Sequence, residues 1–445
     1  MNSLRAAAAA IDRRRWFLLW VLGAAAFFQG YDLNIVAVAL HQLRHSFGLS
    51  QADASLWVSI VFLGALPAVF LTRQADRRGR RTLLLWSILG YTVATGLTAL
   101  APTIGVFVTC QFFARLFLGT EDALVWTMVA EELPAGSRGF GFGWLSMLAA
   151  LGTGTSALLY GAVLSPLGAS WRYLYVLALP PLLGVAVLRR KLPESRRFVR
   201  ARSHDQLARH WQQIVQPPHR RWLVLLCVTS VLAALTTYAS TFAVDFLQTE
   251  RHLSITASSL LIVGAGAPAI VVLLVAGALS DRYGRKLIGC SFAMLAVAGA
   301  LSFFFLARNP LALYAALTVT FVGTFGAGPA LGAFGTELFP TSLRALGGSA
   351  VAITRVLGQA LSLGLGGVLL HLFGSMPDTV AVLVLGPVAM VIVIAVFFPE
   401  THGRELEEIH GEPAFTVPVA MPEVPIIPGV PVGPSLGPSS PVPDL

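Results

Sequence analysis

Six charged residues stand inside long apolar runs of this sequence, where a charge needs a chemical reason. They are Asp32, Arg115, Glu121, Asp122, Asp245 and Arg355. On insertion scales, an Asp or Arg at the centre of a bilayer costs about 2.5 to 3.5 kcal/mol. Such residues are expected to pair with one another or to face water, so they are the first candidates for function.

Asp32 and Arg115 form the first candidate pair, and its chemistry is proton transfer. Removing a carboxyl group from water favours its protonated form, whereas a neighbouring guanidinium favours the ionised form. A transport cycle that made and broke the pair would therefore take up and release a proton. We expect Asp32 to carry the proton with Arg115 as its partner; the alternative is a static pair that only orients two helices.

Arg355 suits a negatively charged solute, because its guanidinium presents two parallel donors to a carboxylate. Gln359 follows it on the same face of a helix, and Tyr238, Thr241 and Asp245 form a second polar stripe at helical spacing. These stripes predict a binding site for an organic anion. In the alternative, Arg355 simply pairs with Asp245 or with a backbone carbonyl.

Asp122 follows Arg115 by seven residues, so both lie on nearly the same helical face, whereas Glu121 is turned away by about 100°. We expect Asp122 to face the substrate and Glu121 to pair with a neighbouring helix. A charge network without a substrate role is equally consistent. Aromatic rings provide either a stacking wall or plain packing. The predicted substrate contacts are Gln29, Asp122, Trp126, Tyr238, Thr241, Asp245, Phe325, Arg355 and Gln359.

Twelve apolar runs must position these residues. Of the 445 residues, 56% are hydrophobic and 12% are charged, whereas soluble domains have about 25% charged residues. Each run can cross a hydrocarbon core of about 30 Å as a helix. The sequence therefore predicts an all-α membrane protein and excludes an ordinary soluble enzyme. The runs cover approximately 16–41, 53–74, 82–101, 103–131, 139–165, 169–191, 221–248, 254–279, 287–307, 310–337, 344–373 and 376–398.

The 31 lysines and arginines are distributed unevenly between the two sides of the predicted membrane. On one side lie 25 of them, including Arg189 at the end of the sixth run, and the alternate loops hold four. The positive-inside rule makes the basic side cytoplasmic, which places both termini in the cytoplasm. The net charge of +9 therefore reflects topology, and no nucleic-acid partner is expected.

Short polar motifs after the second, fourth and sixth runs recur after the eighth, tenth and twelfth, at an offset of 205 or 206 residues. The recurrence predicts two six-helix bundles of the same orientation with pseudo-two-fold symmetry, at 1–191 and 221–411. A cytoplasmic segment at 192–220 joins them, and a proline-rich, disordered tail follows at 412–445. The repeated positions are Asp76, Arg77, Gly79, Arg80, Glu131, Arg138 and Glu194 in the first half and Asp281, Arg282, Gly284, Arg285, Glu337, Arg344 and Glu400 in the second.

We expect the repeated charges to form salt bridges between the bundles. Such bridges would hold an inner gate shut in the outward-open state and break as that gate opens. In the alternative, the basic residues only set the topology of the chain. The glycine at the same position in both loops indicates a tight turn.

The paired Asp-Arg-x-Gly-Arg loops resemble the signature of the major facilitator superfamily, and the resemblance covers about residues 16–410. Gly30-Tyr-Asp32 and the Pro-Glu-Ser and Pro-Glu-Thr motifs resemble the sugar-porter branch. The run from Glu337 to Arg344 is similar to the organic-ion and synaptic-vesicle-protein-like transporters and to metabolite–proton symporters. The resemblance implies a central cavity lined by the helices that carry Asp32 and Arg115. The sugar porters' Gln-Gln pair is absent, which argues against a plain hexose.

Together these features predict a secondary active transporter of the cell membrane that moves a small organic solute with protons by alternating access. An organic anion or carboxylate metabolite is the first choice, and a sugar or polyol, carried by symport or uniport, is the second. We expect a monomer in the lipid bilayer, without a cofactor. Absence of a Walker A motif argues against ATP-driven transport. The rival classes are a membrane-embedded enzyme, for which the histidines offer no ligand-spaced set, and a transport-dead sensor.

Overall fold

The computed structural model describes residues 12–133, 137–190, 213–217, 219–340 and 343–401. Within these residues the chain is helical and contains no strand. Twelve helical spans are long and apolar enough to cross a membrane, which confirms the twelve predicted runs. The predicted tail at 412–445 and most of the joining segment at 192–220 lie outside the described residues.

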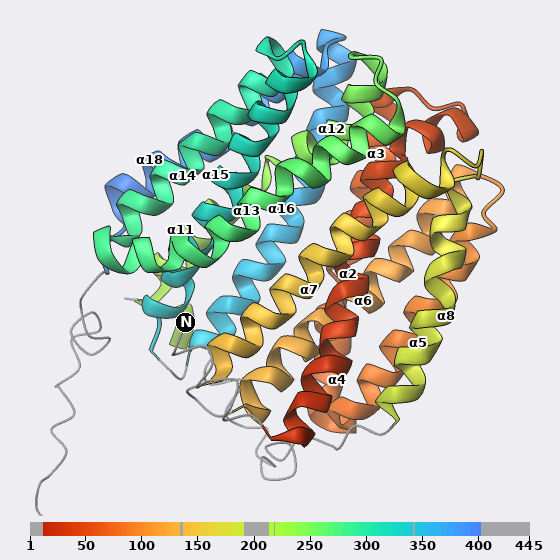
Figure 1. Cartoon of the computed structure of the whole chain (residues 1–445). Helices are drawn as coiled ribbons and strands as arrows, with labels where there is room; N and C mark the ends of the chain where they lie inside the picture. Colours follow the sequence, from red (N-terminus) through yellow and green to blue (C-terminus); the bar gives the residue numbers. More distant parts are fainter. Residues whose placement is uncertain (1–11, 134–136, 191–212, 218, 341–342, 402–445) are drawn as a thin grey trace, which may run out of the picture.

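The first six spans form the N-terminal bundle (Figure 1). In it, α2 packs along α7, and α5 packs against both α6 and α8. Gly30 permits the close approach of α2 and α7, because a Cβ atom there would come within 1.9 Å of the Ala149 carbonyl oxygen. The helices are α2 (Arg13–Phe47), α3 (Gln51–Leu63), α4 (Ala68–Arg78), α5 (Arg80–Ala99), α6 (Ile104–Glu132), α7 (Arg138–Leu158) with the π-helical turn η2 (Leu159–Leu164), and α8 (Arg172–Arg189).

The last six spans form the C-terminal bundle. There α15 packs against α13 and α14, while α11 packs against α16 and α18. The helices are α11 (His219–Ala234), α12 (Thr237–Thr249), α13 (Ile255–Tyr283), α14 (Arg285–Leu301) with the π-helical turn η3 (Ser302–Leu306), α15 (Pro310–Glu337), α16 (Arg344–Phe373), α17 (Met376–Leu383) and α18 (Leu385–Phe397).

The second and seventh spans are each divided into two helices. α3 ends at Leu63 and α4 begins at Ala68, with Pro67 between them. Proline lacks a backbone N–H and clashes with the preceding turn, so a break here is expected. In the seventh span the α-helix is interrupted at residues 235–236, between α11 and α12. Each break separates a half that touches the other bundle from a half that packs within its own.

The two bundles meet mainly at one end of the molecule. There α3 packs against α16, α12 packs against α2, and α13 packs against α7 and η2. By contrast, α4 packs against α5 and α6 of its own bundle. In Figure 1, the labels of α3 and α12 both stand near the top of the picture, at this end of the molecule. We call this end, formed by residues 41–59 of α2 and α3, 241–259 of α12 and α13, and 360–367 of α16, the closed end.

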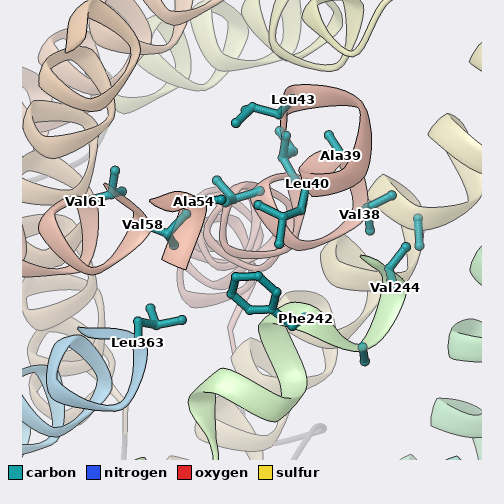
Figure 2. Packing of buried hydrophobic residues seen from close by; sticks show 14 of the residues in the cluster. Val38, Ala39, Leu40, Leu43, Ala54, Val58, Val61, Phe242, Val244 and Leu363 are labelled. Carbon is teal, nitrogen blue, oxygen red and sulfur yellow. The ribbon is translucent and has the colours of Figure 1, made fainter. Parts of the chain in front are cut away.

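An apolar layer fills the contact at the closed end. Figure 2 shows Leu40 from α2, Val58 from α3, Phe242 from α12 and Leu363 from α16 within one group of buried side chains. All four side chains are almost completely buried. Because these residues come from both bundles, the hydrophobic effect stabilises the bundles against each other here.

The two repeated loops have the same backbone geometry. Gly79 and Gly284 have φ angles of 93° and 106°, a region that side-chain-bearing residues rarely adopt. At Gly284, a Cβ atom would also meet the carboxylate of Glu400 at 2.9 Å. The prediction that glycine makes a tight turn in both loops is confirmed.

Candidate functional site

Asp32 lies in the interior of the N-terminal bundle, on α2, at 0% exposure. Neither of its carboxylate oxygens has a hydrogen-bond partner within the described part of the chain. Arg115 on α6 is also buried and is close enough to interact with Asp32 electrostatically. Its guanidinium carbon lies 4.8 Å from the centre of the Phe62 ring. The predicted pair therefore shares one region without a direct hydrogen bond between its members.

Hydroxyl groups surround this pair. Tyr91 and Thr95 on α5 and Tyr175 on α8 are buried close to Asp32, and the Tyr91 hydroxyl is near both Asp32 and Thr95. None of the three hydroxyl groups completes a hydrogen bond within 3.5 Å among the described residues. Buried polar groups are nearly always hydrogen-bonded, so such a cluster requires a functional or solvent explanation. These three residues were not predicted, because a hydroxyl-bearing residue in an apolar helix is common and gives no distinctive signal.

Glu121 lies on a different side of α6 and makes a buried ion pair. Its Oε1 accepts a hydrogen bond at 2.5 Å from Arg189 of α8, whose side chain is completely buried. The guanidinium of Arg189 also donates to the Leu84 carbonyl on α5 at 3.1 Å. Glu121 is thus an interhelical partner, as expected. Arg189 was counted with the basic side of the chain. The structure buries its side chain inside the bundle, where it joins α5, α6 and α8.

Asp122 is the half-buried acidic residue next to Glu121, and it faces away from the Arg189 pair. Its Oδ1 accepts a hydrogen bond of 2.6 Å from Nε1 of Trp126, one turn further along α6. Gln29 on α2 lies beside the same carboxylate. Arg355 of the other bundle also interacts with Asp122 electrostatically. The structure thus brings four of the predicted substrate contacts together, from both bundles.

Other predicted substrate contacts are distributed along the C-terminal bundle. Tyr238 is buried and stacks on Phe242 with ring centres 4.6 Å apart, and Thr241 is buried one turn away. Gln359 on α16 and Phe325 on α15 are both half-buried. No hydrogen bond, ion pair or ring contact joins these four residues to the Asp122 group in the described part of the chain, so their substrate role stays a prediction.

Asp245 occupies the closed end, where it is completely buried. Nη1 of Arg44 lies 2.8 Å from both of its carboxylate oxygens. Nε2 of Gln51 donates to Oδ2 at 3.0 Å, and Nδ1 of His41 lies 3.2 Å from Oδ1. Its partners all belong to the N-terminal bundle, and none is Arg355. Asp245, predicted as a substrate contact, is therefore placed in a polar clasp between the two bundles.

Further hydrogen bonds reinforce the closed end. Ser55 and Ser59 of α3 donate to the carbonyls of Leu363 and Ala360 on α16, at 2.6 and 2.8 Å. Thr256 of α13 donates to the Gly161 carbonyl at 2.5 Å. All hydrogen bonds that join two described residues across the bundles lie at this end. No local pattern in the sequence indicates these pairs, whose members are separated by 95 or more positions.

At the opposite end, the repeated motif of the C-terminal half forms a compact charge network. Arg285 pairs with Asp281 at 2.6 Å and with Glu337 at 2.9 Å. The Glu400 carboxylate accepts from the backbone N–H groups of Arg285 and Lys286 at 2.8 and 3.1 Å. Each of these contacts lies within one bundle, whereas we expected the repeated charges to bridge the two. Arg282 has its guanidinium over the neighbouring Tyr283 ring.

Most of the equivalent charged side chains of the N-terminal half lie outside the part of the chain that the structure describes. Glu194 lies outside the described residues, and Arg80 begins α5. The structure does not describe the side chains of Asp76, Arg77, Glu131 and Arg138, nor that of Arg344 in the C-terminal half. Their gating role stays a prediction.

The family model named Major Facilitator Superfamily matches residues 22–246 and 226–434. The chain belongs to the major facilitator superfamily. The family model matches the chain twice, in agreement with the internal repeat. As a member of this superfamily, the chain is a multi-pass membrane transporter.

Among curated members of the superfamily, the chain is 33% identical to the niacin transporter NiaP of Acinetobacter baylyi over 186 residues, which is 42% of each protein. It is 25% identical to the sialic acid transporter NanX of Escherichia coli over 209 residues, which is 47% of this chain and 50% of NanX. The chain thus matches half or less of the length of these two proteins.

The solved structures of the superfamily show the same fold. The crystal structure of a D-xylose–proton symporter superposes with a TM-score of 0.74 and 17% identity, over 87% of this chain and 99% of the symporter. At this identity the likeness concerns the arrangement of helices. It confirms two six-helix bundles.

Proposed function

We propose that this superfamily member moves a small organic carboxylate across the cell membrane by proton-coupled alternating access. Both chain termini lie in the cytoplasm in this proposal, because 25 of the 31 lysines and arginines fall on their side of the spans. The closed end then faces outward, and the described conformation opens toward the cytoplasm.

The buried, unpaired carboxyl group of Asp32 carries the proton-coupling proposal. A carboxyl group fully removed from water, beside an arginine that does not hydrogen-bond to it, exchanges a proton when its surroundings change slightly. A static structural pair would be expected to make direct hydrogen bonds, as Glu121 and Arg189 do. The unpaired hydroxyl of Tyr91 offers a route for the proton next to Asp32.

Arg355 supports a carboxylate as the substrate. Its side chain is exposed within a membrane span and has no hydrogen bond or ion pair within the described residues, so its guanidinium is available to a ligand. Niacin and sialic acid, named for two relatives, are both carboxylic acids. Trp126, at 36% exposure, offers a ring face close to the same place.

The clasp at Asp245 supports alternating access. It joins α2 and α3 of one bundle to α12 of the other, and it must open for the outward-facing state to form. The charges at the opposite end lie within the C-terminal bundle, as expected for a conformation whose inner gate is open. In the outward-open state, we expect the repeated charges of the two halves to approach each other.

A sugar or polyol is the second candidate substrate. The structural likeness to a D-xylose–proton symporter favours it. A neutral solute would leave the guanidinium of Arg355 without a charged partner, and for this reason we place it second.

The test is uptake of labelled solutes into proteoliposomes with an imposed pH gradient, outside acidic. We expect carboxylates to accumulate against their gradient and neutral sugars to be transported at least about tenfold more slowly. Preference for neutral sugars would overturn the carboxylate proposal. Carboxylate uptake that is insensitive to the pH gradient would overturn proton coupling.

A further inference from the structure

Two opposite charges face each other from the two bundles at the predicted substrate site. Asp122 stands on α6 of the N-terminal bundle, and Arg355 stands on α16 of the C-terminal bundle. They are near enough to interact electrostatically but make no ion pair within 4.0 Å. A ligand that reaches both side chains touches a negative and a positive group at once.

The N-terminal side of this site is prepared for a hydrogen-bond donor or a cation. Asp122 holds one oxygen against Nε1 of Trp126, which fixes the carboxylate and the indole ring side by side. The ring lies 5.4 Å from Phe142 at a tilt of 42°, and Trp126 has 36% of its surface exposed. A carboxylate next to an open indole face is a favourable setting for a cationic nitrogen, through charge and cation–π attraction.

The C-terminal side is prepared for an anion. The guanidinium of Arg355 has no partner among the described residues, and its planar fork fits a carboxylate with two parallel hydrogen bonds. A simple monoanion would satisfy Arg355 but would place its uncharged end beside the Asp122 carboxylate. That carboxylate would then lose water without gaining a donor, which weakens binding.

We infer that the substrate is a zwitterion: a small, flat molecule with a carboxylate at one end and a cationic nitrogen at the other. The inference rests on the proposed function, which supplies the carboxylate, and adds the positive centre. Its carboxylate binds Arg355, and its cationic nitrogen binds Asp122 against the Trp126 ring. Because the two anchors belong to different bundles, such a substrate links the bundles and favours an occluded state. A molecule with only one of the two charges cannot do so.

The test compares three molecules of one shape on the full-length protein. N-methylpyridinium-3-carboxylate carries both charges, 3-methylbenzoate carries only the anion, and N-methylpyridinium-3-carboxamide carries only the cation. Binding is measured with labelled compounds in detergent, independently of any pH gradient. We expect the zwitterion to bind at least about tenfold more tightly than either relative. A second matched pair, glycine betaine and 3,3-dimethylbutyrate, repeats the comparison without a ring.

Two variants test which side chain binds which charge of the ligand. Asp122→Asn should remove the preference for the zwitterion while leaving the binding of 3-methylbenzoate within about twofold or improving it. Arg355→Gln should weaken the zwitterion and the anion together. Asp378→Asn, which changes an exposed carboxylate on α17, is the matched control and should change neither.

Each outcome decides between the inference and the proposed function. Equal binding of the zwitterion and the anion by the unmodified protein, or a preference that survives Asp122→Asn, overturns the inference and leaves carboxylate transport standing. Preference for the carboxamide cation, or failure to bind any carboxylate in either set, overturns the carboxylate proposal and the inference with it.

Discussion

Asp32 and Asp245 are both completely buried carboxylates on membrane-spanning helices, but their surroundings are opposite. Asp245 contacts Arg44, His41 and Gln51. Asp32 has no hydrogen-bond partner within the described residues, although Arg115 lies close by. Asp245 joins the two bundles, whereas Asp32 lies inside one of them.

The difference separates two tasks that a transporter requires. A carboxylate that accepts hydrogen bonds from several donors is fixed in place, and it fixes the geometry of the groups around it. A buried carboxyl group without donors is subject to two opposing influences, its burial and the neighbouring guanidinium, so its charge responds to small movements nearby. We therefore propose that Asp245 is a structural contact between the bundles and that Asp32 exchanges the proton.

The largest effect is expected at Asp32. Asp32→Asn has nearly the same shape but cannot exchange a proton, so uphill uptake should be abolished while exchange of labelled for unlabelled solute continues. For one proton per solute and no membrane potential, one pH unit supports about tenfold accumulation, and the variant should reach only equal concentrations. Both quantities are measured in proteoliposomes. Full active uptake by the variant would show that Asp32 is not the proton carrier and would contradict its contrast with Asp245.

The next largest effect concerns Glu121, a third buried carboxylate that has a partner but lies within one bundle. Glu121→Gln should lower the free energy of unfolding by about 3 to 5 kcal/mol, because Arg189 is left buried without a counter-charge. Replacing both residues by leucine should recover most of that loss. Thermal unfolding in detergent measures the stability of each variant. The Glu121→Gln protein that remains folded should still couple transport to protons. A loss of coupling would show that a carboxylate with an ion-pair partner can also take part in proton coupling.

At the closed end we expect a shift in conformation. Asp245→Asn should weaken the clasp by about 2 kcal/mol, since Arg44 loses its counter-charge across the bundles. The conformational equilibrium should then shift toward the state in which the bundles are separated at this end. Spin labels at the exposed positions His45 and Glu250, on the two sides of the clasp, report the separation. The exposed Asp53→Asn at the same end is the matched control. An unchanged distance distribution in Asp245→Asn would show that the apolar layer alone holds this end.

The smallest effect is expected from the neutral hydrogen bonds. Ser55→Ala and Ser59→Ala each remove one donor to a carbonyl of α16 and should weaken the closed end by about 1 kcal/mol each. The same spin-label distances detect the change. If either serine variant opened this end more than Asp245→Asn does, the charged clasp would lose its leading role.

Much of the fold could be predicted from the sequence, since the twelve spans and the two-bundle repeat are encoded in local composition and in motifs at fixed spacing. The breaks in the second and seventh spans were not predicted. In the second span, Pro67 marks the break, but the apolar run continues on both sides of it; residues 235–236 of the seventh span contain no proline or glycine. Hydropathy reports which residues avoid water and carries no information about a turn inside an apolar run.

The site was predictable only where a charge interrupted an apolar run. Asp32, Asp122 and Arg355 stand out in this way. Arg44 and Arg189 do not, because each lies near the end of a span, where an arginine that faces water looks the same in the sequence. The partner of Arg44 is 201 positions away, so no local pattern connects them. Only the folded arrangement shows which basic residues turn inward.

The contacts of the closed end also bear on how fast the cycle can run. In the proposed alternating-access cycle, the apolar layer and the clasp both come apart once in every turnover. Any part of their free energy that is lost before the barrier is crossed adds to the height of that barrier, and each additional 1.4 kcal/mol slows the step about tenfold. Hydrogen bonds such as those of Ser55 and Ser59 can be exchanged for bonds to water, which limits what their rupture costs. A tighter seal made only of larger apolar side chains would close this end more firmly and make the carrier slower.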